Sequence, residues 1–211
     1  EKGKIKGRYT IFGKNPDKIW EFNNNNSYLI KNKKKIKLKD KPDQLIEKII
    51  EDFKFETPKK LPKICSLISG YFSYDSIRYI EKIPNKCKND LNLPDVRLLR
   101  PRTLVIYDNL KKEIFYIINI FSDEKIKNYA KKYEEIKIEL SKILIQSSLK
   151  ISNYLSKKNI KDIKVKSNTS KNKFIKMVNK AKDYIKLGDI FQVVLSQRFE
   201  AKLTKKPLDI Y

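Results

Sequence analysis

Histidine is absent from this chain of 211 residues, and cysteine, methionine, tryptophan and arginine are scarce. Without histidine, the chain cannot build Ser–His or Cys–His nucleophilic catalysis or a histidine-ligated metal site. The two cysteines, Cys65 and Cys87, show neither a C-x-x-C pair nor a metal-binding spacing, which predicts reduced thiols and a cytoplasmic setting. No run of about 18 apolar residues occurs, so we expect no membrane span and no membrane partner.

The formal net charge of +24 is the most conspicuous property of the composition. A basic chain can indicate a nucleic-acid partner, because neutralising phosphates drives non-specific binding. Here the excess is almost all lysine, spread along the chain with abundant isoleucine and asparagine, and all three have A/T-rich codons. Arginine, which reads phosphates and bases better, is rare. We therefore favour compositional drift and predict no nucleic-acid partner.

Hydrophobic periodicity and turn signals predict strands and helices in mixed order through the first 150 residues. The predicted elements are a strand at 7–13, a hairpin turning at 23–26, an edge strand around 36–38, a helix after Pro42, a hairpin of strands 104–107 and 114–120, and a long helix from Ser122 to about Leu149. This pattern is typical of an α+β fold with mainly antiparallel sheets packed by helices. We predict a first domain at 1–152, a linker at 153–168 and the beginning of a second domain at 169–211.

Two further features of the first half are the stretch 64–75 and the arginines between 97 and 102. In the stretch 64–75, ICSLISGYFSYD, Gly70 permits a bend or a close backbone approach, and we expect Asp75 to cap a short helix and to pair with Arg78. Arg97, Arg100 and Arg102 form the best anion-binding candidate in this half, although we favour solvated charge on a loop.

The stretch 170–199 changes from helical to strand periodicity. A helix is predicted from Ser170 to Leu187, with Thr169 or Ser170 as its N-cap and Gly188 in a left-handed turn at its end. The next residues alternate, which predicts a strand at 191–199. Its mostly apolar face carries Phe191, Val193, Leu195, Gln197 and Phe199, and its other face carries Gln192, Val194, Ser196 and Arg198. An amide, a hydroxyl and a guanidinium on one face indicate a border with water or a polar ligand.

These residues carry a family resemblance. The sequence 181–199, AKDYIKLGDIFQVVLSQRF, resembles the opening of the chorismate-binding domain of anthranilate synthase component I, a family of chorismate-utilising enzymes. The glycine–aromatic–tyrosine–aspartate element at 70–75 is similar to one in the family's N-terminal domain, where an acidic residue and a proline also follow, as Glu81 and Pro84 do here. Complete members are more than twice this long, so the resemblance implies an inactive N-terminal fragment, in which the domain at 1–152 is incomplete at its start and the chorismate-binding domain at 169–211 is truncated.

The resemblance implies a lyase of tryptophan biosynthesis. Such an enzyme adds ammonia to C2 of chorismate and then eliminates pyruvate to give anthranilate. A glutamine amidotransferase subunit supplies the ammonia, and Mg²⁺ holds the substrate carboxylate. The metal ligands are expected beyond Tyr211, so no metal site is expected within this chain. Tryptophan is a possible feedback inhibitor, although the Leu-Leu-Glu-Ser segment that helps to bind it would lie before Glu1.

One residue of the strand fits this chemistry. Ammonia needs a neutral dipole that positions it, whereas a water nucleophile needs a base. In isochorismate-forming relatives the position that matches Gln192 is a lysine, which activates water. We predict that Gln192 faces the pocket and positions ammonia, and a satisfied polar side chain on a half-buried strand is the alternative. Ser196 and Arg198 share its face and are weaker candidates for binding substrate.

Two other functions stay open. Aminodeoxychorismate synthase component I, of the folate pathway, has a similar pocket strand and a similar GYFSYD-like element, but FQVVLSQRF favours the anthranilate enzyme. A basic nucleic-acid-binding protein is the alternative from another class.

Overall fold

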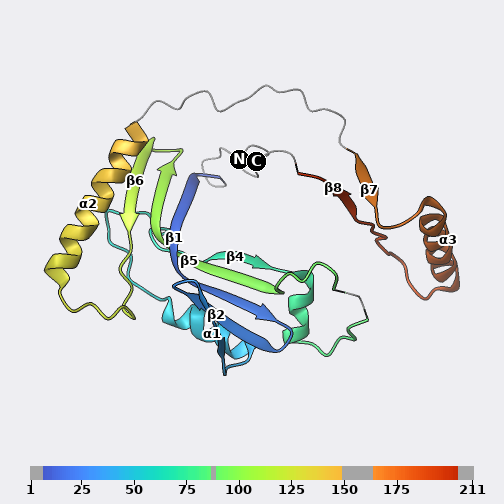
Figure 1. The fold of residues 1–211 in the computed structure, drawn as a ribbon. Helices are drawn as coiled ribbons and strands as arrows, with labels where there is room; N and C mark the ends of the chain where they lie inside the picture. Colours follow the sequence, from blue (N-terminus) through green and yellow to red (C-terminus); the bar gives the residue numbers. More distant parts are fainter. Residues whose placement is uncertain (1–6, 87–88, 149–163, 204–211) are drawn as a thin grey trace. The chain divides into compact units, whose positions relative to one another are not determined.

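The structure is a computed structural model that describes residues 7–86, 89–148 and 164–203 (Figure 1). The chain forms two compact units, residues 1–149 and 150–211.

The first unit is built on an antiparallel sheet in the order β3-β2-β1-β5-β4, with β6 also paired to β5. Its strands are β1 (Tyr9–Asn23), β2 (Asn26–Lys31), β3 (Lys34–Leu38), β4 (Ser69–Phe72), β5 (Val96–Asp108) and β6 (Glu113–Ile118). The long strand β5 pairs with β1 along its whole length, while β4 and β6 pair with its first and second halves. The predicted hairpins at 23–26 and 104–120 are confirmed, as is the lysine-rich edge strand β3.

The core of this unit lies between the sheet and helix α1 (Pro42–Asp52). Pro42 stands in the first turn, where its fixed φ suits a helix and its missing N–H is not needed. Leu45 and Ile49, one helical turn apart, are the side chains of this helix that are buried against the sheet. The buried cluster comprises Trp20, Phe22, Leu45, Ile49, Val96 and Leu98.

Two prolines interrupt the ladder between β1 and β5. Pro16 lies opposite Pro101, and the register shifts between Pro16 and Lys18. Because neither proline can donate a ladder hydrogen bond, this is where an extra residue is tolerated as a bulge. The extra residue is Asp17, whose carboxylate bonds the side chain of Arg100 on β5. The segment 97–102, predicted as a loop, is therefore strand, and that prediction is wrong.

Gly70 allows β4 to join the sheet. A Cβ at this position would lie 1.9 Å from the backbone oxygen of Arg97, so only glycine permits the close approach. The 3-10 helix η1 (Tyr74–Tyr79) follows. Asp75 pairs with Arg78 at 2.8 Å, as predicted, but the N-cap is Ser73, so the prediction of an Asp75 cap is wrong.

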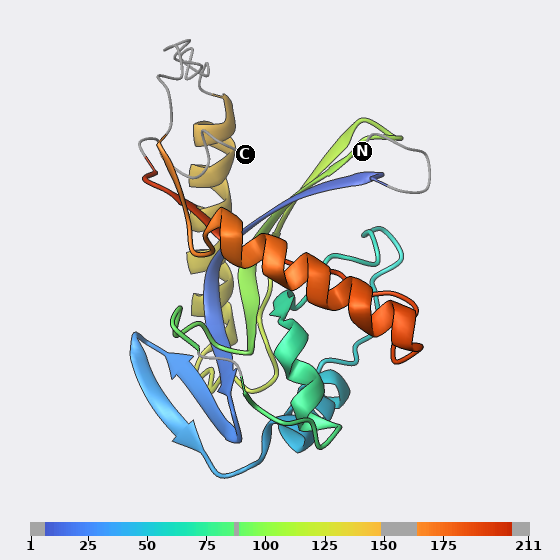
Figure 2. The ribbon, with the colours of Figure 1, turned by 90° about the vertical axis from the view of Figure 1, so that its right-hand side faces the viewer.

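Helix α2 (Tyr129–Ser148) lies beside β6 (Figures 1 and 2) and begins seven residues later than Ser122, the predicted start. Asp123 and Glu124, expected in its first turn, instead bond arginines of β5. The helix starts after Asn128, whose side-chain oxygen accepts a hydrogen bond from the Lys131 N–H. The ion pairs of Asp123 and Glu124 with these arginines thus keep the turn before Asn128 outside the helix.

The second unit contains β7 (Val165–Ser167), α3 (Lys171–Leu187) and β8 (Phe199–Ala201), with β7 and β8 antiparallel. The predicted caps of α3 are confirmed: the Ser170 hydroxyl accepts from the Lys173 N–H, and Gly188 has φ 79°. The predicted strand 191–199 is wrong, because residues 191–198 have no strand pairing and only Phe199 begins one. Alternation alone makes no strand without a partner to hydrogen-bond. Of the predicted linker 153–168, residues 153–163 lie outside the described residues, and residues 165–167 form β7.

Candidate functional site

The three predicted site residues lie between α3 and β8. Gln192 and Ser196 are exposed, and Arg198 is half-buried beside Glu200, whose carboxylate accepts from its Nε at 3.1 Å. The Asn168 N–H donates to the Arg198 carbonyl oxygen, and the Arg198 N–H donates to the side-chain oxygen of Asn168. Without a regular strand, the alternation that would put the three on one face is lost, and the role of Gln192 stays a prediction.

The apolar neighbours of Gln192 are also exposed. Phe191 is 95% exposed and Val194 82%, and α3 buries none of its residues. A large apolar side chain gains free energy only when it is removed from water. The described part of the second unit therefore leaves this segment uncovered.

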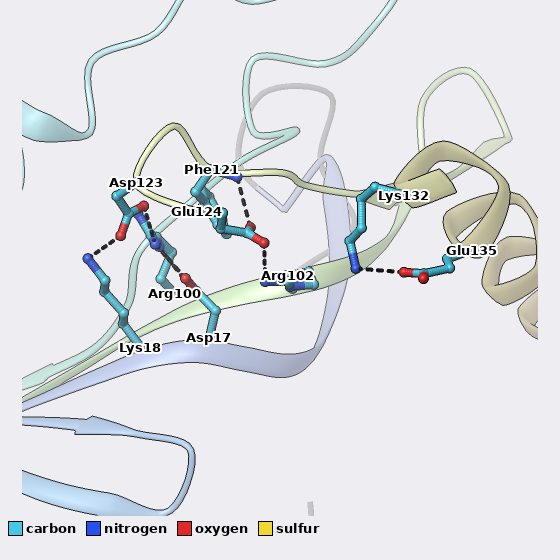
Figure 3. Close-up of polar contacts among 9 residues, drawn as sticks. All are labelled: Asp17, Lys18, Arg100, Arg102, Phe121, Asp123, Glu124, Lys132 and Glu135. Atoms are coloured by element: carbon cyan, nitrogen blue, oxygen red, sulfur yellow. Dashed lines mark hydrogen bonds and ion pairs between the residues drawn. The ribbon is translucent and has the colours of Figure 1, made fainter. Parts of the chain in front are cut away.

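A second candidate is a charged cluster around Arg100 in the first unit (Figure 3). Arg100 is buried, and its guanidinium donates to Asp17 at 2.9 and 2.5 Å and to Asp123 at 2.9 Å. Asp123 also pairs with Lys18. The guanidinium stacks on Phe121, 3.7 Å from the ring centroid. Strands β1 and β5 and the turn before α2 meet in this cluster.

The electrostatics of the cluster favour its charged forms. Burial alone would raise the pKa of Asp123, but hydrogen bonds from Lys18 and Arg100 outweigh burial and lower that pKa to about 2. Burial would lower the pKa of Arg100, but its bonds to the two aspartates outweigh that effect and raise it. At neutral pH Arg100 and Asp123 therefore stay charged, and neither suits acid–base catalysis there.

The other arginines of β5 are also paired with carboxylates. Arg102 bonds Glu124 at 2.8 Å, and Glu124 accepts from the Phe121 N–H at 3.0 Å (Figure 3). Arg97 contacts Glu21 at 3.4 Å. The arginines at 97, 100 and 102 are thus paired with carboxylates of the same chain. Sequence reasoning missed the acids because Asp17 carries no periodic signal and residues 123–124 look like a helical first turn.

Another ion pair lies at one end of the β1–β5 ladder, where Tyr9 is opposite Asp108. Arg8 bonds Asp108 at 2.7 Å, and Asp108 is 2% exposed and also accepts the N–H groups of Leu110 and Lys111. The Arg8 hydrogen bond, supported by these N–H groups, holds the pKa of Asp108 well below its usual range. This pair ties the start of β1 to the turn after β5, which is a structural task.

Metal and thiol chemistry find little support. Within residues 7–86, 89–148 and 164–203, no group of three or more His, Cys, Asp or Glu side chains could hold a metal ion. Cys65 is buried, and burial raises the pKa of its thiol, which disfavours the reactive thiolate. In the same described ranges, no helix is long and apolar enough to cross a membrane. Cys87 lies outside the described residues.

Comparison with known proteins decides the family. A family model described as chorismate binding enzyme matches residues 8–211. The chain belongs to the chorismate binding enzyme family. It is 35% identical over 217 residues to anthranilate synthase component 1 of Acetivibrio thermocellus, covering 100% of this chain and 44% of that protein. It is 29% identical to anthranilate synthase component 1 of Cereibacter sphaeroides, covering 99% and 43%.

The fold comparison agrees. The crystal structure of anthranilate synthase component I from Streptococcus pneumoniae TIGR4 superposes with a TM-score of 0.77 at 26% identity, covering 98% of this chain and 45% of that one. The predicted α+β fold and the resemblance to anthranilate synthase component I are thereby confirmed. The chain spans under half the length of the relatives that it matches.

Proposed function

We propose that this chain is part of the large subunit of anthranilate synthase, a lyase that converts chorismate and ammonia into anthranilate and pyruvate in tryptophan biosynthesis. The observation that carries the proposal is the likeness along essentially the whole chain to proteins named anthranilate synthase component 1, together with the matching fold. We place the enzyme in the cytoplasm, with chorismate as substrate, a glutamine amidotransferase subunit as partner and tryptophan as a feedback inhibitor.

Gln192 is the residue of this chain that we assign to the chemistry. Its side chain is exposed, so its amide is free to line a cavity together with parts of a longer enzyme. A neutral amide can orient ammonia by hydrogen bonding without generating hydroxide from water. Ser196 and Arg198 are assigned to substrate binding at the same cavity. Mg²⁺ would hold the substrate carboxylate, but no group of three or more candidate ligand side chains is found for it among the described residues.

A segment exchange tests the proposal. Residues 1–211 replace the matching segment of the Acetivibrio thermocellus enzyme, and the chimera is incubated with chorismate, Mg²⁺ and ammonium salt. We expect anthranilate, detected by its fluorescence, and an equal amount of pyruvate, while residues 1–211 alone give neither. Aminodeoxychorismate in place of anthranilate would assign the chain to the folate-pathway enzyme. A folded chimera without either product would refute a chorismate-converting role.

The Gln192 assignment has its own variant. Gln192→Lys in the chimera should reduce the rate with ammonia and divert product toward the hydroxyl adduct, because a lysine amine can act as a base for water. Ser167→Ala serves as a matched control, since its hydroxyl bonds Gln197 in the same segment and we assign it no chemistry. Unchanged products and unchanged ammonia kinetics in Gln192→Lys would remove Gln192 from the mechanism.

A further inference from the structure

A cleft of about 770 Å³ lies in the first unit between the β2–β3 turn and the chain from Glu124 to Glu135. Its remaining walls come from residues 15–17 of β1 and from Arg102 of β5. We propose that this cleft binds a compact multivalent anion of the oligophosphate class. The lysines that line it are Lys31, Lys33, Lys125, Lys127, Lys131 and Lys132.

The acidic side chains of the cleft are already neutralised. Asp17 bonds Arg100, and Glu124 bonds Arg102. Glu135 bonds Lys132 at 3.3 Å, so one lysine is neutralised as well (Figure 3). The other five lysines are exposed and have no carboxylate partner among the residues that the structure describes. Compositional drift accounts for the number of lysines in the chain but not for their arrangement here. Each acid that lines the cleft is paired with a cation, and five lysines of the cleft have no such partner within the described ranges.

The β2–β3 turn holds one of these lysines at the edge of the cleft. Its two residues, Asn32 and Lys33, have φ angles of 51° and 62°, both in the left-handed region. Two-residue hairpins of this kind favour glycine at the second position, where a lysine costs conformational energy. Lys112 in the β5–β6 turn has the same conformation, with φ 61°, and does not line the cleft. The turn therefore fixes the position of Lys33, and the proposal depends on the unpaired charges around the cleft.

The same walls argue against nucleic acid as the occupant. No aromatic side chain lines the cleft, so bases have nothing on which to stack. The volume is in the range of small-molecule sites. Lysine ammonium groups are point charges that suit phosphates or carboxylates without requiring a flat, bidentate geometry. A free di- or triphosphate group fits these features better than an extended polymer.

The experiment is calorimetric titration of residues 1–211 with pyrophosphate, tripolyphosphate and citrate at low salt, repeated with single-stranded DNA. In the cleft variant, the five unpaired lysines are all replaced by glutamine. The control variant removes the same charge from α3 by replacing Lys171, Lys173, Lys176, Lys182 and Lys186 with glutamine, all of which are exposed. We expect tripolyphosphate to bind one site, with a dissociation constant at least about tenfold weaker in the cleft variant and changed less than about twofold in the control.

Three outcomes would overturn the proposal. Equal losses in the two variants would show that binding follows net charge alone. No saturable binding of any of the three anions would show an empty surface. DNA binding that is tighter than that of tripolyphosphate and is abolished by the cleft substitutions would assign the cleft to nucleic acid.

A single substitution keeps the test decisive if the fivefold variant does not fold. Lys33→Gly should raise the melting temperature, because glycine suits φ 62°, and should weaken tripolyphosphate binding about two- to threefold. A structural role for this lysine would instead lower the melting temperature. Unchanged affinity together with a raised melting temperature would remove Lys33 from the site and contradict its assignment to the anion.

Discussion

Replacing Arg100 by alanine should destabilise the first unit by about 3 kcal/mol. The side chain is 11% exposed and that of Asp17 8%, so the pair is a buried one. Breaking such a pair costs about 3–5 kcal/mol, because the remaining charge is left without compensation. Asp123 keeps its bond to Lys18, and only Asp17 loses its charged partner, which places the estimate at the lower end of that range. Since domains are stable by only about 5–15 kcal/mol, this loss is easily measured.

The assay is urea denaturation followed by tryptophan fluorescence. The chain has a single tryptophan, Trp20, which is 6% exposed in the core next to α1 and therefore reports on the first unit alone. Arg97→Ala is the matched control on the same strand: Arg97 is 45% exposed, and its partner Glu21 keeps Lys35 at 2.7 Å. Its loss should cost less than about 1 kcal/mol.

The double variant Asp17→Asn, Arg100→Met separates charge from packing. It removes both charges while keeping side chains of similar size, so it should recover much of the loss seen in Arg100→Ala. If Arg100→Ala costs no more than Arg97→Ala, the cluster is not the structural junction that its burial and geometry indicate. If the double variant is as unstable as Arg100→Ala, the unpaired carboxylate of Asp17 does not explain the effect, and the lost contacts of the guanidinium with Asp123 and Phe121 do.

Three further predictions concern the scaffold. Gly70→Ala should cost about 1–3 kcal/mol and speed hydrogen exchange in β4, because the added Cβ would meet the Arg97 oxygen at 1.9 Å; an unchanged β4 would refute the close approach. Folding lowers the pKa values of Asp108 and Asp123, so their contribution to the stability of the first unit should be fully present above about pH 4 and should fall as the pH drops toward about 2. Asp123→Asn should make this fall less steep, as measured by denaturation at each pH. Ser170→Ala should weaken α3 by about 1 kcal/mol, visible as faster exchange in its first turn, whereas Ser170→Asp should preserve the cap.

Local signals in the sequence were sufficient where the partner of an element is close in the chain. The turn at 23–26 and the caps Ser170 and Gly188 follow from short-range chemistry, and each is found as predicted. The start of α2 is not, because Asp123 and Glu124 are held by arginines some twenty residues earlier. Helical propensity cannot show that a carboxylate is held by a distant cation, and tertiary contact then overrides it.

Long-range pairing likewise explains why the arginine run of β5 looked like a loop. Three arginines and a proline within six residues are unusual in a central strand, and nothing local shows that acids will cover them. Pro16 lies opposite Pro101, and the bulge that follows it in β1 brings the Asp17 carboxylate to Arg100. The spacing that matters links residues 83 positions apart in the chain. Such a match becomes visible only once the register of β1 against β5 is known.

The segment 191–199 shows the converse case, in which a pattern is present but its element is not. A strand needs backbone hydrogen bonds on at least one edge, and β7 offers only three residues, which pair with 199–201. Phe191 and Val194 stay in water at a cost that a soluble fold rarely accepts for neighbouring large apolar side chains. Alternation of apolar and polar residues is typical of a sheet with one covered face, so we predict that this segment joins such a sheet in the chimera. Hydrogen exchange on the chimera proposed above examines this directly: amides of 191–198 should be protected there and unprotected in residues 1–211 alone, and equal exchange in both would show that the alternation has no structural meaning.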